Sequence, residues 1–291
     1  MDAISIIGIG RVGRCLGRAL YGKDVTIRSL FNRTVSIAEE FAADTGRPVA
    51  KIFPERKEDL ARITFICVPD DNIRVVAERL SAISRDWDGY SFVHCSGARP
   101  AEELSGLAEK GARIASFHAI QTFPVEPDAG IFKNIWISLQ GDADLLALLV
   151  QYAEVLGAKT IKISAGQKLK LHIAAVFACN YMVTLAGAAE RLLPRDEDHG
   201  IELLAPLMRQ TLERILKTGP ENTLTGPLQR GDLQTLRSHL QTLNDSPELH
   251  DLYTSLGKYT VTLIKEMSAK PQNIDQVSKL FEPGAHNGDF E

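Results

Sequence analysis

Three glycines near the N-terminus have the spacing of a phosphate-binding turn. Gly8, Gly10 and Gly13 follow an apolar run directly and open a predicted helix. In such a turn the first glycine permits a tight bend, the second lets the backbone approach a pyrophosphate, and the third lets helix and strand pack closely. The N–H groups at the helix N-terminus add partial positive charge. The pattern predicts that these glycines, with Arg11 and Val12 between them, bind a dinucleotide.

The end of the second predicted strand indicates which dinucleotide. NAD-binding turns carry an Asp or Glu about 20 residues further on, but here the chain has Phe31, Asn32, Arg33 and Thr34. This segment contains no carboxylate that would repel a 2′-phosphate. Arg33 can pair with such a phosphate, and Asn32 and Thr34 can donate hydrogen bonds to it. We therefore expect NADP. Alternatively, Arg33 is a solvated surface residue and Thr34 or Ser36 caps the next helix.

Two later strand ends are further candidates for cofactor contacts, because ligands of open α/β sheets bind beyond the carboxyl ends of the strands. Val68, Pro69 and Asp70 end one apolar strand, and Ser96 and Gly97 follow another. Asp70 has an equally good task as a helix cap, which we favour. For Ser96 and Gly97 the alternative is a plain strand-end turn.

A proton donor for hydride chemistry is expected among the histidines, because histidine titrates near neutrality without help from its surroundings. His118 follows a predicted strand, and Gln121, Thr122 and Phe123 come next in a loop that can wall a substrate pocket. Alternatively, His118 only shapes this loop. Arg230 is a candidate for binding a substrate carboxylate, although a structural ion pair is slightly favoured for it.

His172 and Asn180 share one predicted helix and complete the catalytic candidates. Eight residues advance a helix by about 800° and about 12 Å, so the two side chains can border one elongated cleft but cannot meet at one small atom. Asn180 serves equally well as a hydrogen-bonding group towards a neighbouring helix or a dimer mate.

The elements that must position these residues alternate over the first 164 residues between β-branched runs and helical patterns. This alternation predicts a Rossmann-type doubly wound parallel sheet with helices on both faces. The predicted strands are 3–7, 25–31, 49–52, 63–68, 91–95, 113–117, 135–139 and 160–163, and the predicted helices are 11–21, 36–45, 72–82, 101–110 and 142–156.

After residue 164 the patterns are helical only, at 166–193, 197–217, 232–243 and 247–267, with one short helix expected beyond residue 271. We therefore predict an NADP-binding domain over 1–164 and an all-α domain over 165–291. The apolar run 173–189 is near the lower length limit for a membrane span, and a buried helix is favoured. Its apolar side chains cover more than one face, which predicts a homodimer.

Composition excludes several classes of function. A net charge of −4 gives no field that would attract nucleic acid or an anionic membrane. Cys15, Cys67, Cys95 and Cys179 lack the spacing of a metal site, so we expect no metal and reduced thiols. No signal peptide is recognisable, which favours a cytoplasmic protein.

The chain resembles bacterial Rossmann-like proteins with a C-terminal helical domain of unknown function, relatives of pyrroline-5-carboxylate reductase and of the 6-phosphogluconate dehydrogenase-like superfamily. Ala119 departs from the proline that similar sequences usually carry after the histidine. In dehydrogenases with this layout the first long helix of the second domain presents a Lys, His or Asn, and His172 resembles that group better than Lys168 or Lys170. The resemblance rests on Gly8–Gly13, on 68–73, 94–98, 117–123 and 172–181, and on 225–232. It implies that the helical domain over 165–291 is a substrate and dimerisation domain.

These observations favour an NADP-dependent oxidoreductase acting on a small carbonyl or imine compound between the domains. A dinucleotide-binding sensor or scaffold without turnover is the alternative from another class, because no unmistakable catalytic lysine or tyrosine pair is present. A third possibility keeps the enzyme but replaces the hydride partner with a deazaflavin coenzyme. The fold alone does not choose among them.

Overall fold

The computed structural model describes residues 1–194, 200–267 and 270–282 of the chain. It divides into two compact units, Met1–Asn180 and Tyr181–Glu291. The first unit includes the start of the long helix that follows residue 164. The functional domain boundary at residue 164 stays a prediction.

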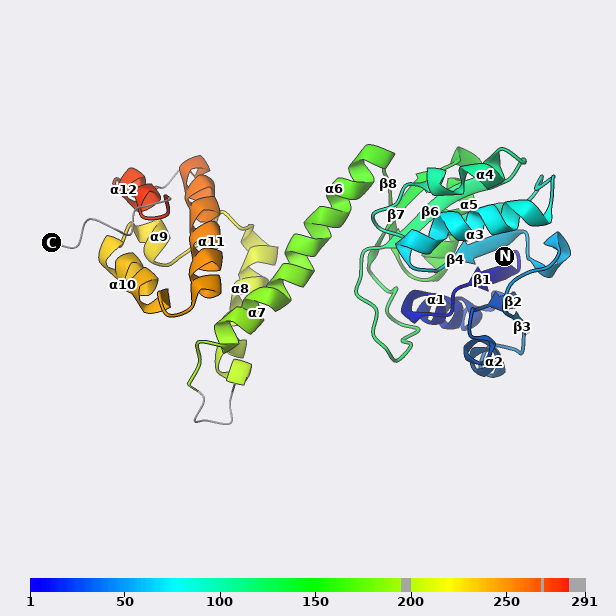
Figure 1. Cartoon of the computed structure of the whole chain (residues 1–291), viewed down its shortest axis with the longest axis horizontal. Helices are drawn as coiled ribbons and strands as arrows, with labels where there is room; N and C mark the ends of the chain where they lie inside the picture. Colours follow the sequence, from blue (N-terminus) through cyan, green and yellow to red (C-terminus); the bar gives the residue numbers. More distant parts are fainter. Residues whose placement is uncertain (195–199, 268–269, 283–291) are drawn as a thin grey trace. The chain divides into compact units, whose positions relative to one another are not determined.

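One mostly parallel sheet of eight strands forms the centre of the first unit, in the order β3-β2-β1-β4-β5-β6-β7-β8 (Figure 1). Every predicted strand is present. The prediction of a wholly parallel sheet is wrong at one place, because β7 runs antiparallel to β6. No helix lies between these two strands, and a parallel connection is usually made through one. The strands are β1 Ile4–Ile7, β2 Ile27–Phe31, β3 Val49–Lys51, β4 Ile63–Ile66, β5 Ser91–His94, β6 Arg113–Ala119, β7 Trp136–Gly141 and β8 Lys159–Lys162.

Helices cover both faces of the sheet because alternate strand residues are apolar on each face. In β1, Ile4 and Ile6 pack into one core and Ile7 into the other. The first core is covered by α1 Arg11–Tyr21, α2 Val35–Ala43 and α5 Ala143–Val155, and the second by α3 Asp70–Ile83, η2 Ala101–Leu104 and α4 Ser105–Ala108. With both faces covered, the loops at the carboxyl ends of the strands are the places where polar side chains gather.

The second unit is helical, as predicted, and has a core of its own. Leu236, Val261 and Phe281 are among its buried residues. The predicted short helix beyond residue 271 is α12, and the rest of that segment, from 283, lies outside the described residues. The helices are α7 Tyr181–Glu190, η4 Gly200–Leu204, α8 Ala205–Thr218, α9 Pro227–Arg230, α10 Leu233–Leu243, α11 Pro247–Glu266 and α12 Ile274–Lys279.

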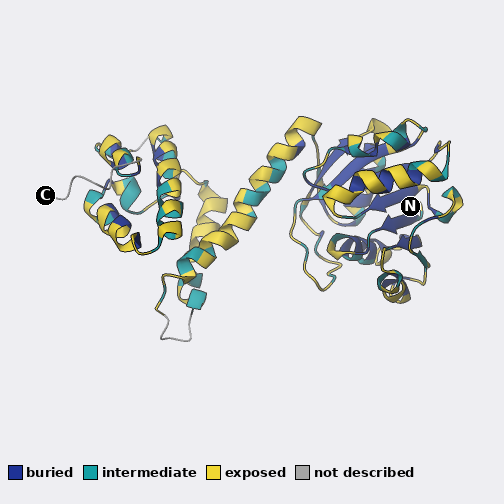
Figure 2. Cartoon of the chain, in the orientation of Figure 1, coloured by how far each residue is buried: buried dark blue, intermediate teal, exposed yellow. Residues whose placement is uncertain are grey.

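The long apolar helix is exposed in the single chain, so the buried helix that the sequence favours is not formed by one copy alone. It runs through α6 Ala165–Ala175, η3 Val176–Asn180 and α7. Figure 2 shows most of this helix in the colours of exposed and intermediate residues. Ile173 is 46% exposed and Val183 is 69% exposed. Over the described residues this is the one helix long and apolar enough to cross a bilayer by length and composition. Its apolar side chains extend around more of the helix than the other described residues cover.

Candidate functional site

The glycine turn between β1 and α1 has the geometry that its sequence predicts. Gly8 has a φ of +97° and its N–H donates to the Phe31 carbonyl over 2.8 Å. A Cβ on Gly13 would lie 2.1 Å from the Gly8 carbonyl oxygen, so only glycine fits where strand and helix meet. At Gly10 a Cβ would meet no atom within 4 Å.

Gly10 is also the N-cap of α1. No side chain caps this helix and no acidic residue stands in its first turn. Because the first N–H groups of a helix have no partner within it, this end is suited to an anion. Arg11 is exposed beside it, whereas Val12 is half-buried.

The end of β2 is tied to this turn through Asn32. Its Oδ1 accepts from the N–H of Ile9 over 3.1 Å, and its Nδ2 donates to the Thr34 carbonyl over 2.9 Å. Thr34 occupies the N-cap position of α2, but its side chain makes no capping hydrogen bond. Arg33 is exposed. Of the three residues predicted to contact a 2′-phosphate, Arg33 and Thr34 have exposed side chains that a ligand can reach. The side chain of Asn32 is used in hydrogen bonds within the turn.

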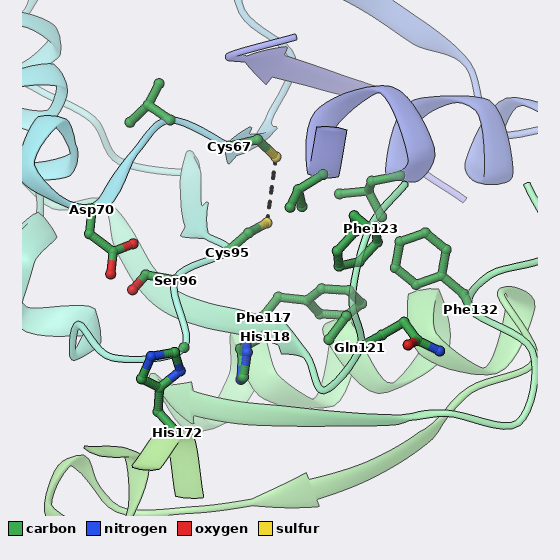
Figure 3. A pocket seen from close by; sticks show the side chains of 15 residues that line it. Cys67, Asp70, Cys95, Ser96, Phe117, His118, Gln121, Phe123, Phe132 and His172 are labelled. Carbon is green, nitrogen blue, oxygen red and sulfur yellow. Dashed lines mark hydrogen bonds between the residues drawn. The ribbon is translucent and has the colours of Figure 1, made fainter. Parts of the chain in front are cut away.

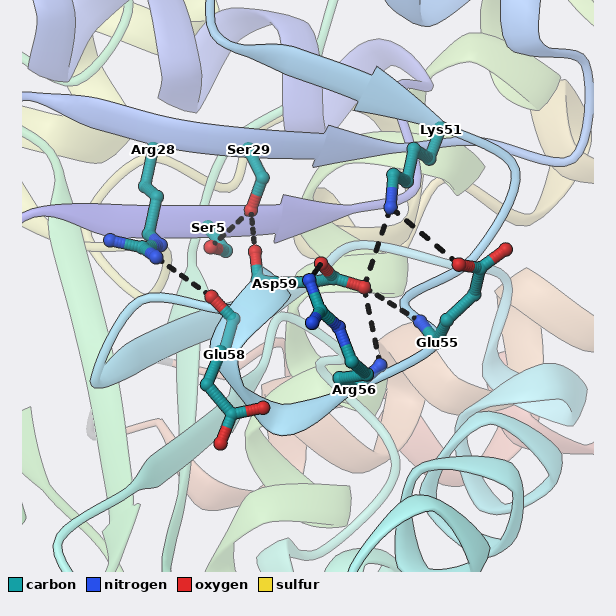
Figure 4. A network of polar contacts seen from close by, with 8 residues as sticks. All are labelled: Ser5, Arg28, Ser29, Lys51, Glu55, Arg56, Glu58 and Asp59. Carbon is teal, nitrogen blue, oxygen red and sulfur yellow. Dashed lines mark hydrogen bonds and ion pairs between the residues drawn. The ribbon is translucent and has the colours of Figure 1, made fainter.

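At the neighbouring end of β3, the Lys51 ammonium group is paired with two carboxylates from the segment that follows the strand (Figure 4). Lys51 Nζ lies 3.5 Å from the Asp59 carboxylate and 3.8 Å from that of Glu55. Burial would raise the pKa of Asp59, but the N–H groups of Glu55 and Arg56, together with Lys51, outweigh burial and lower it. Lys51 pairs with Phe31 across the strands, so these acids sit near the predicted phosphate site with cations beside them.

Beyond the carboxyl ends of β4, β5 and β6 lies a pocket of about 220 Å³ within the first unit (Figure 3). Nine of the predicted site residues line it, namely Val12, Val68, Asp70, Ser96, Gly97, His118, Gln121, Phe123 and His172. The three glycines of the turn, Arg11, the residues after β2, Pro69, Thr122, Asn180 and Arg230 do not line it. Sequence reasoning missed the apolar lining and two cysteines. The lining residues are Val12, Leu16, Cys67, Val68, Asp70, Cys95, Ser96, Gly97, Phe117, His118, Ala119, Gln121, Phe123, Phe132 and His172.

Asp70 faces this pocket and does not cap a helix through its side chain. Pro69 is the N-cap of α3, and Asp70 and Asp71 stand in its first turn. The capping role we favoured for Asp70 is therefore wrong. Carboxylates in the first turn still interact favourably with the helix dipole. Asp71 accepts from Arg99 over 2.9 Å, whereas Asp70 lines the pocket.

His94 has a structural role. It is fully buried, its Nδ1 accepts from the Ser96 N–H over 3.2 Å, and its Nε2 lies 3.0 Å from the Pro100 carbonyl. This pattern assigns the ring proton to Nε2 of a neutral imidazole. Burial, aided by the charge of Lys168, lowers the pKa of His94 to about 4. The ring thereby fixes the turn that carries Ser96 and Gly97.

His118 and His172 approach each other across Gly97. Their ring centroids are 6.2 Å apart. A Cβ on Gly97 would lie 2.6 Å from His118 Nε2 and 2.8 Å from His172 Nδ1, so both rings face the same small space. His118 Nδ1 lies 3.3 Å from Ser138 Oγ. Burial first, and then Lys168 and His172, lower the pKa of His118 to about 4. The expectation that this histidine titrates near neutrality is therefore wrong.

Lys168 belongs to the same cluster, although His172 resembled the catalytic position better. Its side chain is 1% exposed and its Nζ donates to Ser116 Oγ on β6. Burial lowers the pKa of Lys168 to about 8. It lies one helical turn before His172, and residues four apart share a helix face. That spacing, already visible in the sequence, was the signal that could have found it.

Asn180 and Arg230 belong neither to the glycine turn nor to the pocket lining. Asn180 ends η3, is exposed and is engaged by a neighbouring group. Arg230 ends α9 in the second unit, is exposed and acts electrostatically on Asp232, which caps α10 through Thr235. The roles predicted for Asn180 and Arg230 stay predictions.

Comparison with protein families matches both halves of the chain. Residues 2–119 match the model of a Rossmann-like domain, and residues 135–260 match a domain of unknown function, DUF2520. No curated protein matches the chain.

Solved structures match most of the chain. A proposed NADP oxidoreductase from Bacteroides fragilis is 25% identical with a TM-score of 0.71, over 88% of this chain and 96% of that one. A protein from Thermotoga maritima is 27% identical with a TM-score of 0.69, and the match covers 90% of this chain and 98% of that one. A reductive aminase from Aspergillus terreus, in complex with NADPH and ethyl levulinate, is 16% identical with a TM-score of 0.69 over 97% and 100%, and shows the fold alone.

Proposed function

We propose that this chain, which belongs to the Rossmann-like proteins with a C-terminal DUF2520 domain, is an NADP-dependent oxidoreductase acting on a small carbonyl or imine compound. The observation that carries the proposal is the open glycine turn at Gly10, in the same unit as a pocket where His118 and His172 face one small space. The proposed NADP oxidoreductase from Bacteroides fragilis, at 25% identity, supports the same activity.

The residues present fit NADP on the geometry of the turn itself. Gly8, Gly10 and Gly13 leave the N–H groups of α1 open, and no atom occupies the space that a Cβ on Gly10 would enter. Arg33 and Thr34 would hold a 2′-phosphate, and Val68, Ser96 and Gly97 would border the remainder of the cofactor. When bound, the reduced nicotinamide supplies the hydride.

The chain's own contribution is to position the substrate, polarise it and supply a proton. His118 is neutral at neutral pH, so its ring donates or accepts one hydrogen bond at Nε2, towards the space beside Gly97. His172 Nδ1 faces that space from α6. The Lys168 ammonium beneath them gives a positive potential, which stabilises negative charge developing on a carbonyl oxygen or imine nitrogen. We assign polarisation and proton transfer to the two histidines.

The decisive experiment measures oxidation of NADPH against a panel of keto acids, aldehydes and cyclic imines. We expect turnover with at least one class, and a loss of about 100-fold or more in kcat for His118→Ala with NADPH binding retained. Full turnover in that variant would remove His118 from the mechanism. Binding of NADPH without turnover across the panel would favour the sensor.

The exposed helix leads to a second part of the proposal, a homodimer of a cytoplasmic protein. Ile173, Met182 and Leu185 are each more than 40% exposed on α6 and α7. Large contiguous apolar surfaces on soluble proteins mark interaction sites. A second copy of the chain carries the same surface and can bury it symmetrically.

A further inference from the structure

Two cysteines lie side by side at the edge of the sheet. Cys67 and Cys95 each follow the last residue of a strand, and those last residues, Ile66 and His94, are paired across β4 and β5. The Cys95 N–H donates to the Ile66 carbonyl over 3.2 Å, which continues the strand pairing to the cysteines. The two Sγ atoms are 3.5 Å apart.

This geometry allows a disulfide with little backbone movement. Neighbouring strands are about 4.8 Å apart, and disulfides join residues whose Cα atoms are about 4.4–6.8 Å apart. The sulfurs must approach by about 1.5 Å to reach bonding distance. Side-chain rotation supplies such a shift without separating the strands.

Both sulfurs belong to an accessible site. Cys67 and Cys95 are half-buried and line the pocket (Figure 3). Cys15, by contrast, is fully buried in the core. Cys179 lies on η3, and among the described residues its sulfur makes no contact with the pair. Among the described cysteines, Cys67 and Cys95 are therefore the two that can form a disulfide within one chain.

The two thiols are not equivalent. The hydrogen bond to Cys95, followed by burial, raises the pKa of Cys67 well above its ordinary value. Cys67 is thus the thiol that keeps its proton. The thiolate is the nucleophile in disulfide exchange, so we assign the attack on a reagent to Cys95, the other thiol of the pair.

We propose that Cys67 and Cys95 are an oxidisable dithiol that a small organic disulfide converts to an internal disulfide. The Cys95 thiolate attacks one sulfur of the reagent, breaks its S–S bond and releases one thiol, which takes the proton lost from Cys95. Cys67 then gives its proton to the second leaving thiolate as its sulfur attacks Cys95 Sγ. Two protein thiols are oxidised and one reagent disulfide is reduced to two thiols.

Coenzyme controls this reaction, and this second part rests on the proposed function. Val12, at the glycine turn, and Gly97, beside the histidines, line the same pocket as the two sulfurs. A dinucleotide that runs from that turn to Gly97 covers the cysteines and shields them from the reagent. The reduced dithiol is then the form that binds coenzyme, and the disulfide forms when the pocket is free.

The first test uses the full chain carrying Cys179→Ser, treated with the disulfide of mercaptoethanol and followed by intact mass and peptide mapping. We expect the loss of two hydrogen atoms and a peptide pair joined through Cys67 and Cys95. Adding Cys67→Ser should leave one reagent thiol attached to Cys95, and adding Cys95→Ser should leave much less adduct. Two thiols that stay free, or an adduct on Cys95 that never resolves with Cys67 present, would overturn the dithiol.

The second test repeats the reaction with NADPH at about 100 times its measured Kd, where nearly all of the protein is liganded. Closure of the disulfide should be about tenfold slower or more, because only the unliganded fraction reacts. An unchanged rate in the liganded protein would overturn the protection. A Tm that NADPH does not raise would instead count against the proposed function, and the mass result without coenzyme would still decide the dithiol.

Discussion

Because Gly97 has no side chain, the imidazole rings of His118 and His172 can both lie beside it. A methyl group there would lie 2.6 Å from His118 Nε2 and 2.8 Å from His172 Nδ1, closer than nonbonded atoms approach. The position of Gly97 is in turn fixed by His94, which accepts from the Ser96 N–H. Glycine is therefore required at this position by its neighbours rather than by its own backbone conformation.

Gly97→Ala should lower turnover strongly in a chain that still folds. Displaced imidazoles lose the alignment that proton transfer requires, so we expect kcat to fall about 100-fold or more. Gly106→Ala is the matched control, because a Cβ there meets nothing within 4 Å, and it should keep its activity. Equal activity in the two variants would contradict the roles assigned to His118 and His172.

Acid should destabilise the first unit through His94. Its pKa is about 4 in the folded chain and 6.5 unperturbed, so below pH 6.5 the unfolded chain binds the proton and the folded chain does not. The neutral His94 ring therefore contributes its full stabilisation to the folded chain above pH 6.5. This contribution, on the order of 3 kcal/mol, is lost as the pH falls towards 4.

Urea unfolding at several pH values measures this loss. Both tryptophans, Trp87 and Trp136, lie in the first unit, so their fluorescence reports on it. His94→Gln should be less stable at neutral pH but should lose less stability on acidification. A variant whose free energy of unfolding falls as steeply with pH as that of the unaltered chain would refute the assignment to His94.

At the scale of elements, the glycine turn and every strand could be predicted, because apolar runs and turn residues act locally. The direction of β7 was missed, since it depends on the helix-free segment between β6 and β7. The sequence predicts a buried helix at 173–189 whose apolar side chains cover more than one face, and the exposure of α6 and α7 in one copy fits the second part of that prediction. An apolar pattern shows that a helix needs a partner, but not that the same chain supplies it.

The sequence places Lys168 one helical turn before His172, but the role of Lys168 depends on where α6 packs. Ser164 caps this helix with a reciprocal bond to Gln167, which sets its start. One turn later Lys168 reaches Ser116 on β6, buried below the two histidines. Neither the distance from α6 to β6 nor the burial of an ammonium group can be derived from sequence periodicity.

Lys168→Met should make the first unit more stable and the enzyme less active. A methionine fills a similar volume without burying a charge, which we expect to add about 1 kcal/mol to the free energy of unfolding. Loss of the positive potential should lower kcat by about tenfold or more. Tryptophan-monitored urea unfolding and NADPH oxidation measure the two effects, and a less stable variant with full activity would contradict this account of Lys168.

At the scale of the whole molecule, the chain combines a Rossmann-like sheet with a helical unit that has its own core. Apolar side chains are concentrated on the exposed surface of α6, α7 and α8, where Leu216 is 79% exposed. A net charge of −4 offers little repulsion between two copies. The composition thus agrees with self-association.

Val183→Asp should convert the proposed dimer to a monomer. Val183 is 69% exposed on α7, so a single chain tolerates the change, whereas a buried symmetric interface would receive two unpaired carboxylates. Sedimentation at micromolar concentration measures the mass. A monomer before the substitution, or an unchanged dimer after it, would contradict the proposed interface.

The most direct test of the whole account is the effect of coenzyme on Tm in the unaltered chain and in Gly10→Ala. A Cβ on Gly10 meets no atom of the protein, so the variant should melt at nearly the same temperature without ligand. We predict that NADPH raises the Tm of the unaltered chain by several degrees more than NADH does, and that Gly10→Ala loses this gain. A Tm that neither coenzyme raises, or an equal gain from NADPH in the variant, would contradict a dinucleotide bound at this turn.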